Sequence, residues 1–136
     1  MISASAWTLA LGIGLVAAQT MTADAATLSQ QIRGSTWELV SLTVILPDGK
    51  KIQPLGTHPL GYAMFDKTGR YISTDLNPNV PNFVSGNLLK GTDAEYRAAA
   101  TGGGMDFGTY TVDDKKRILV KHVIGASFPN WKGTDI

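Results

Sequence analysis

The stretch from Lys115 to Gly133, KKRILVKHVIGASFPNWKG, decides how the rest of the chain is interpreted. Its first half alternates with a period of two and is rich in β-branched residues, which predicts a half-buried strand. The more apolar side of that strand includes one polar side chain, His122, and we expect this side to face the interior. Its members are Ile118, Val120, His122 and Ile124.

The strand runs into an aromatic block, Phe128-Pro129-Asn130-Trp131. Proline cannot donate a hydrogen bond to a β-ladder, so the block should end the strand. A strand that carries an inward histidine and ends in two large aromatic side chains is typical of the wall and mouth of a small β-barrel.

The composition is that of one ordinary globular domain. The chain has 136 residues and a net charge of +1, and it carries no basic patch, which makes nucleic acid a poor candidate partner. Cysteine is absent, so disulfides, thiolate metal sites and a cysteine nucleophile are excluded. The two histidines fall in unrelated settings and no phosphate-binding glycine motif is present, so we expect neither a bound metal nor a cofactor.

The N-terminus predicts a signal peptide. Residues 4–18 are mostly apolar, which is shorter than the roughly 20 apolar residues that span a bilayer, and Ala23-Asp24-Ala25 follows as a cleavage site. We expect residues 1–25 to be removed and residues 26–136 to form a periplasmic or secreted domain, without stable membrane insertion. The first residues lack Lys and Arg, which leaves an uncleaved anchor or a misplaced start codon as the alternatives.

Six strands and one short helix are predicted for the domain. The clearest turn signals are Pro47-Asp48-Gly49-Lys50 and Asp66-Lys67-Thr68-Gly69. A capping box at Thr92-Asp93-Ala94-Glu95 begins the helix, which the glycines after Thr101 end, and a helical lead-in is expected at Thr27–Arg33. The first four strands should form a meander. The strands span residues 36–46, 51–53, 60–65, 70–76, 105–112 and, last, the stretch quoted above.

An antiparallel meander of this kind leaves two open edges, which sheets usually avoid. An up-and-down barrel that holds a ligand closes with about eight strands. We therefore expect an incomplete barrel that lacks its last strands, and open edges that favour self-association or poor solubility.

Several segments resemble the bacterial and fungal lipocalin-like domain family. The most specific runs from His122 to Gly133, and the others are residues 34–41, 59–62, 66–73, 96–99 and 107–112. The resemblance covers about Ile32 to the last residue. It implies a small calycin-type barrel with a cavity and further strands after Gly133. It implies no single activity, because some related barrels serve as isomerases or cyclases in natural-product pathways.

His122 is the sharpest candidate for chemistry. A histidine on an apolar face can serve as a general base. No carboxylate lies near it in the sequence to orient it, which favours a hydrogen-bonded core histidine instead. No catalytic residue is therefore assigned, and His122 is kept as a candidate only.

A ligand cavity is lined mostly by apolar side chains with a few polar groups. Packing in the barrel core explains most of the candidates equally well, and a plug at the barrel end is favoured for Trp37 and Trp131. Asp66, Asp75 and Asp106 are expected to be solvated charges. The candidate ligand-binding residues are Tyr62, Met64, Tyr71, Tyr110, His122 and Trp131.

The leading hypothesis is an all-β, antiparallel, up-and-down lipocalin-like barrel that binds a small apolar molecule. The alternative is a cofactor-free isomerase or cyclase that uses His122 and a tyrosine as acid and base. A third interpretation is a structural domain with a filled core. A second inward polar residue on the missing strands would separate the enzyme from the binding protein.

Overall fold

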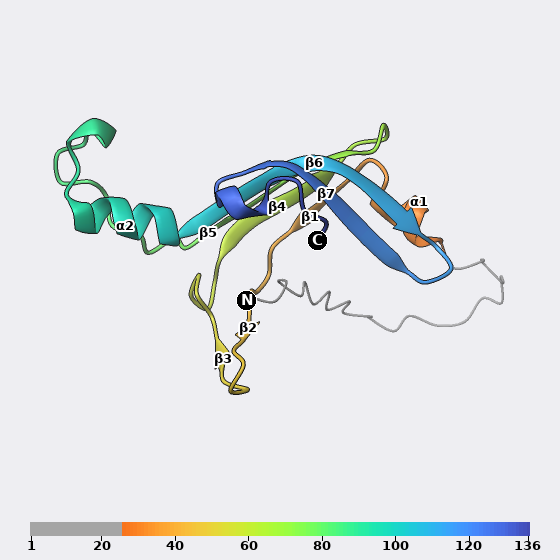
Figure 1. Cartoon of the computed structure of the whole chain (residues 1–136), viewed down its shortest axis with the longest axis horizontal. Coiled ribbons are helices and arrows are strands. Elements are labelled where there is room, and N and C mark those ends of the chain that lie inside the picture. The colour runs from red at the N-terminus through yellow and green to blue at the C-terminus, as the bar shows by residue number, and fades with distance from the viewer. Residues whose placement is uncertain (1–25) are drawn as a thin grey trace, which may run out of the picture.

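The computed structural model describes residues 26–136 (Figure 1). The predicted signal peptide, residues 1–25, lies outside the described residues. The described part contains an antiparallel five-stranded sheet, a separate two-stranded hairpin and a few short helices. None of its helices has both the length and the apolar character that crossing a membrane requires.

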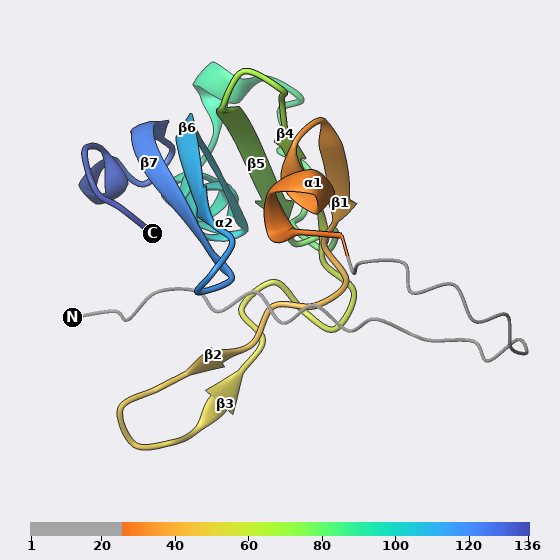
Figure 2. The same ribbon diagram turned by 90° about the vertical axis from the view of Figure 1, so that its right-hand side faces the viewer.

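The main sheet has the strand order β1-β4-β5-β6-β7, and every neighbouring pair is antiparallel. The strands lie side by side in this order in Figure 2, and the sheet is curved but not closed into a barrel. The predicted all-β antiparallel fold is therefore confirmed. The strands are β1 (Ser35–Glu38), β4 (Leu60–Phe65), β5 (Arg70–Leu76), β6 (Gly103–Asp113) and β7 (Ile118–Ala126).

The hairpin between β4 and β5 forms at the predicted residues because its turn is closed by a side chain. The Asp66 carboxylate accepts hydrogen bonds from the backbone N–H groups of Arg70 (2.8 Å) and Thr68 (2.7 Å). These bonds, with the Thr68 hydroxyl, hold the pKa of Asp66 below its ordinary value. Gly69 takes a φ of 93°, which favours glycine. The bounds of both strands are as predicted.

The predicted single strand over residues 36–46 is wrong. β1 ends at Glu38, and the chain then leaves the main sheet for a separate hairpin. Both sides of the predicted strand carry apolar residues, and a strand with one buried face cannot bury them all. β1 instead pairs directly with β4, so the predicted four-strand meander does not form. The hairpin consists of β2 (Val44–Ile45) and β3 (Lys51–Ile52). A small core near its base is formed by Leu39, Leu42 and Leu55.

The predicted helices are confirmed. The main helix, α2 (Asp93–Thr101), begins with the expected capping box between Thr92 and Glu95. The lead-in helix, α1 (Leu28–Ile32), is also closed by a capping box. β6 begins at Gly103, directly after the residue that caps α2 and two residues earlier than expected.

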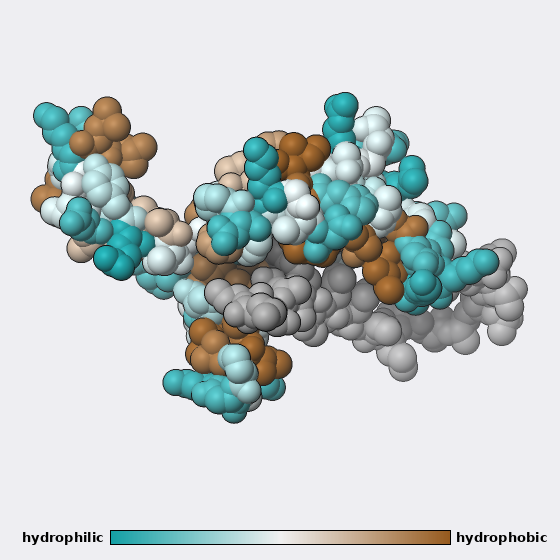
Figure 3. All heavy atoms as spheres, in the orientation of Figure 1, coloured by the Kyte–Doolittle hydropathy of each residue, from teal (hydrophilic) through white to brown (hydrophobic). Residues whose placement is uncertain are grey.

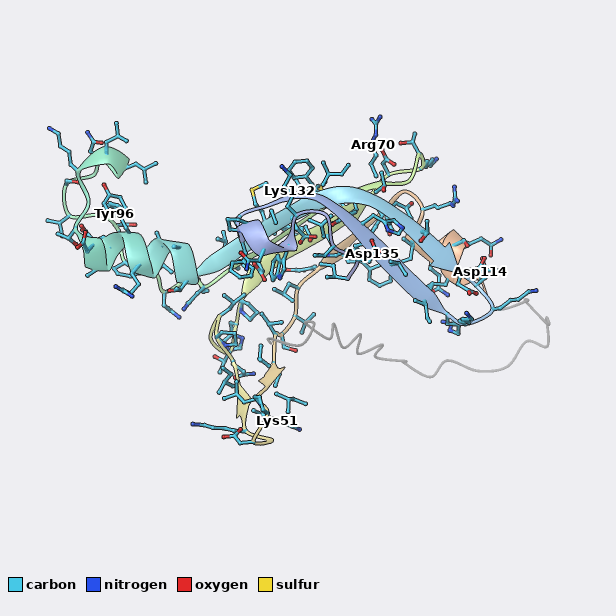
Figure 4. The ribbon with its side chains drawn as sticks, viewed as in Figure 1. Lys51, Arg70, Tyr96, Asp114, Lys132 and Asp135 are labelled. Atoms are coloured by element: carbon cyan, nitrogen blue, oxygen red, sulfur yellow. The ribbon has the colours of Figure 1, made fainter. Side chains whose placement is uncertain are left out.

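Residues 77–102 form an arm between β5 and β6 that extends away from the sheet (Figure 1). The base of the arm is closed by a hydrogen bond from the Asn77 N–H to the Gly102 carbonyl, at 2.7 Å. Its outer part contains α2 and a short 3₁₀ turn, η1 (Leu88–Lys90), to which the Tyr96 hydroxyl donates a hydrogen bond (Figure 4). Figure 3 shows hydrophobic residues at the tip, where Leu89 is exposed.

We define the inner face of the sheet as the face on which α1 packs, and the outer face as the opposite one. α1 lies across one end of the curved sheet (Figure 2), and Ser29 binds Asp114 in the β6–β7 turn through its N–H at 2.8 Å. The Phe65 and Tyr110 rings meet edge to face, with centroids 5.2 Å apart. The buried core of this end consists of Ile32, Phe65, Tyr71 and Tyr110.

A β-bulge interrupts the pairing of β6 with β7. Phe107 lies opposite Gly125 and Gly108 lies opposite Val123, so β7 contributes one extra residue. The two backbones approach closely at this point, because a Cβ added at Gly108 would lie 2.0 Å from the His122 carbonyl oxygen. Glycine at position 108 is therefore required by the space available.

Candidate functional site

The inner face carries an apolar core at the α1 end, then a polar layer, and a pocket at the opposite end. Alternate residues of a strand share a face, so Tyr71, Ser73 and Asp75 of β5 all point inward. The first lies in the apolar core beside α1. Ser73 lies opposite Asp106 of β6 in a polar layer. Asp75, one step further, lines a pocket at the end of the sheet remote from α1.

The polar layer is built around a buried ion pair. Lys121 Nζ lies 2.8 Å from Oδ2 of Asp106 and 3.1 Å from Oγ of Ser73. The Asp106 carboxylate also accepts hydrogen bonds from the Tyr71 hydroxyl, at 2.7 Å, and from the Ser73 hydroxyl. The side chains of Lys121 and Asp106 are only 10% and 9% exposed. Buried charges are tolerated when they are paired and hydrogen-bonded in this way.

The surroundings alter the protonation of two inward side chains. Burial, followed by the hydrogen bond to Asp106, raises the pKa of Tyr71, which keeps its hydroxyl a neutral donor. Burial is the largest effect on Asp75 and raises its pKa, and the charge of Asp106 raises it further. The hydrogen bond from the Gly104 backbone and the charge of Lys121 act in the opposite direction but do not cancel this rise. Asp75 is therefore held closer to neutrality than an ordinary carboxyl group.

The pocket has a volume of about 400 Å³ and adjoins the polar layer. It lies where α2 meets the start of β6, beside the loop that follows β7 (Figure 1). Most of its walls are apolar, and Asp75 is the one charged side chain among the described residues that line it. The lining residues are Pro54, Leu55, Asp75, Ala100, Thr101, Gly103, Gly104, Ser127, Phe128, Pro129 and Trp131.

The aromatic side of the pocket is fixed by the segment after β7. The Ser127 N–H donates to the Met105 carbonyl (2.8 Å), and the Ser127 hydroxyl accepts from the Met105 N–H (3.0 Å). A 3₁₀ turn, η2 (Pro129–Trp131), follows. It places the Trp131 ring edge to face with Phe128, with centroids 5.6 Å apart. The predicted aromatic block thus forms one wall of the pocket.

The polar side of the pocket depends on a glycine. A Cβ added at Gly104 would lie 3.0 Å from the Asp75 carboxylate and 3.4 Å from the Ser127 hydroxyl oxygen. Glycine at this position therefore leaves both polar groups uncovered by a side chain. The two groups stand close enough to contact one bound molecule.

The residues predicted to line a ligand site do not gather in one place. Trp131 lines the pocket. Tyr71 and Tyr110 lie on the inner face but are buried in the core near α1. Tyr62 and Met64 lie on the outer face and are largely exposed. Of these five, only Trp131 belongs to the candidate site.

The predicted inward orientation of His122 is wrong. Its neighbours Lys121 and Val123 are buried, whereas the His122 side chain is 37% exposed on the outer face. Its Nδ1 lies 2.7 Å from Oδ1 of Asp135, and its Nε2 lies 3.1 Å from Oγ1 of Thr111. The set of a hydroxyl, an imidazole and a carboxylate resembles an activated nucleophile, but none of the three lines the described pocket.

His122 instead joins β7 to the segment that follows the pocket. The backbone of Lys121 exchanges hydrogen bonds with Ile136, at 2.7 and 3.0 Å, and the Val123 N–H donates to Thr134. Asp135, labelled in Figure 4, lies on this segment. The pairing covers part of the β7 edge, which the sequence predicted to be open.

The charged residues of the site lie where the sequence pattern did not predict them. Asp75 and Asp106 were expected to be solvated, yet Asp106 is buried and Asp75 is partly buried. The signal was present in the alternation, since Asp106 shares a strand face with Gly108 and Tyr110. Lys121 likewise shares a strand face with Leu119 and Val123. No group of three or more His, Cys, Asp or Glu that could hold a metal ion occurs in residues 26–136.

The comparison with protein families agrees with this architecture. The family model described as a lipocalin-like domain matches residues 34–136. The chain therefore belongs to the lipocalin-like domain family, and the resemblance found in its sequence is confirmed. No curated protein and no solved structure matches the chain.

Proposed function

We propose that this protein binds a small hydrophobic molecule in the pocket beside Asp75. The observation that carries the proposal is an open pocket of about 400 Å³ whose lining is mostly apolar and includes one carboxyl group. Small-molecule sites of proteins have volumes of about 300–1,000 Å³ and combine an apolar lining with a few polar groups.

The fold supports the same proposal. A lipocalin-like domain provides a curved sheet whose inner face is suited to hold small hydrophobic molecules. In this chain the α1 end of that face is filled by packed side chains such as Phe65 and Tyr110, so it leaves little room. The opposite end of the described inner face carries the pocket, whose lining includes Leu55 and Trp131.

We do not extend the proposal to an isomerase or a cyclase. That reaction was expected to use His122 together with a tyrosine in one cavity. The histidine contacts Thr111 and Asp135 on the outer face, whereas Tyr71 and Tyr110 are buried on the inner face. The side-chain hydrogen bonds of His122 go to Thr111 and Asp135 and not to a tyrosine, so no observation favours acid–base catalysis by such a pair.

We further propose that the protein is exported, on the sequence of its first 25 residues. Cleavage after Ala25 would release a chain that begins at Ala26. N-terminal sequencing of the protein from the periplasm or the culture medium tests this, and an intact Met1 in the membrane fraction would contradict it.

Binding is tested with the neutral apolar fluorophore Nile red. Ala100 lines the pocket from the last turn of α2, so Ala100→Trp should fill part of the volume. We expect Nile red to bind the full chain with a fluorescence increase, and Ala100→Trp to weaken binding at least about tenfold, a loss of about 1.4 kcal/mol.

The matched control is Ala99→Trp, which places the same side chain on the same helix at a residue that does not line the pocket. It should bind Nile red as the unmodified chain does. Equal binding by both variants would place the fluorophore elsewhere, and the absence of any binding by the unmodified chain would refute the proposed function.

A further inference from the structure

We infer that the pocket takes an apolar molecule that carries a protonated amine, with Asp75 as the counter-ion. This inference rests on the proposed function and adds the chemical class of the ligand. It follows from the balance of charges around the pocket, from the contacts that occupy the neighbouring charges, and from the aromatic wall.

The charges of the pocket lining are of one sign. Asp75 is the single ionisable acid among the described residues that line it, and no Lys, Arg or His lines it. The other polar groups of the lining are hydroxyls and backbone. An ionised Asp75 therefore gives the pocket a net negative charge that its own walls do not balance.

The basic side chain of the adjoining polar layer is engaged within that layer. Lys121 makes a 2.8 Å ion pair with Asp106 and a 3.1 Å hydrogen bond with Ser73. Asp106 in turn accepts hydrogen bonds from Tyr71 and Ser73. The charges of the polar layer are matched one to one, so this layer adds little net positive charge to oppose Asp75.

A bound cation would remove the cost of ionising Asp75. Burial raises the pKa of this carboxyl group, which means that its charged form is disfavoured in the empty pocket. An ammonium group within about 4–6 Å favours the charged form of a carboxyl group. A neutral ligand could also accept a hydrogen bond from the protonated acid, and the experiment below separates these two cases.

The aromatic residues of the pocket lining suit the same ligand. Phe128 and Trp131 both line the pocket and pack edge to face at 5.6 Å. Aromatic rings attract ammonium groups through their quadrupole, and they also bury the apolar part of a ligand. A carboxylate and two aromatic rings on one pocket therefore complement a molecule with a cationic end and an apolar body.

The test uses three compounds that differ only in their polar end: 2-phenylethylamine, 2-phenylethanol and 3-phenylpropionate. Each is titrated against the complex of the full chain with Nile red at neutral pH. We expect the amine to displace the fluorophore at a concentration at least about tenfold lower than the alcohol, because it alone pairs with Asp75. The carboxylate should be the weakest of the three.

The variant Asp75→Asn keeps the shape of the side chain and removes its charge. It should bind the amine and the alcohol equally, with the affinity for the alcohol unchanged. A second measurement needs no variant: the affinity of the unmodified chain for the amine should fall on acidification as Asp75 becomes protonated, while the affinity for the alcohol stays constant.

The outcomes are distinct. Equal affinities for amine and alcohol in the unmodified chain, or tightest binding of the carboxylate, would overturn the inference and leave the proposed function standing. A preference for the amine that survives in Asp75→Asn would overturn it as well. If Nile red does not bind the unmodified chain at all, the proposed function itself fails.

Discussion

The Nζ of Lys121 lies 2.8 Å from the Oδ2 of Asp106, and both side chains are about nine-tenths buried. The residues belong to adjacent strands, β6 and β7. Their pairing places two opposite charges inside a face that is otherwise apolar at the α1 end. This ion pair is the boundary between the packed core and the pocket.

Removing one partner of the pair should destabilise the fold strongly. Lys121→Met leaves Asp106 buried without its cation, and breaking a buried pair in this way costs about 3–5 kcal/mol. Urea unfolding of the full chain measures the loss. The double variant Lys121→Met/Asp106→Asn should lose less than the sum of the single changes, whereas additive losses would show that the two charges are not coupled.

Asp75→Asn should make the protein more stable at neutral pH. The pKa of Asp75 is raised in the folded state, so the folded protein loses stability as the pH rises through that pKa, and asparagine does not ionise. The gain should shrink towards the unfolded carboxyl pKa of about 3.9. Urea unfolding across this pH range tests the sign, and a gain that grows on acidification would contradict it.

A matched variant, Asp48→Asn, controls for the loss of one acidic group. Asp48 lies in the exposed turn between β2 and β3. The variant removes one acidic group without touching the pocket lining, so its stability is compared with that of Asp75→Asn at each pH.

His122→Phe should leave ligand binding unchanged and weaken the attachment of the following segment. The change removes the contacts of His122 with Asp135 and Thr111, which lie on the outer face away from the pocket lining. A contact between exposed polar side chains contributes at most about 1 kcal/mol. Unfolding and Nile red titration measure the two effects, and a loss of Nile red binding would show that His122 acts on the pocket.

Gly108→Ala should destabilise the β6–β7 pair. The added methyl group would lie 2.0 Å from the His122 carbonyl oxygen, so one of the two backbones must move. Overpacking of this kind costs about 1–3 kcal/mol. Thr109→Ala, at the exposed neighbouring position, should stay within about 0.5 kcal/mol of the unmodified chain. Equal stability of both variants, measured by urea unfolding, would show that the strands adjust freely.

Local signals predicted the parts of the fold that short-range contacts determine. The hairpin at Asp66 and the helix at Thr92 are each closed by side chains that bond within a few residues. Such contacts depend on neighbouring residues alone, so their position could be found from the sequence. Trp131 was found for a similar reason, because an aromatic block around a proline is a local feature.

The orientation of β7 depends on a contact that no local pattern contains. Its two faces carry similar numbers of apolar residues, and the face with His122 is the more apolar by sequence. Lys121 nevertheless points inward, because Asp106 on the neighbouring strand supplies the charge that makes its burial tolerable. The position of Asp75 in the pocket depends likewise on segments far along the chain, namely Leu55 and Ser127.

The hydrogen bond between Asn77 and Gly102 closes the base of the arm, so the arm is an insertion between two paired strands. β5 and β6 already stand side by side at its base, with Leu76 opposite Gly103, so the chain leaves and re-enters the sheet at almost one point. The outer arm can be lengthened, shortened or replaced, by evolution or by design, without changing the pairing of β5 with β6. The last turn of α2 is different, because Ala100 and Thr101 line the pocket. Variation at the tip therefore leaves the pocket lining unchanged, while variation at the base alters it.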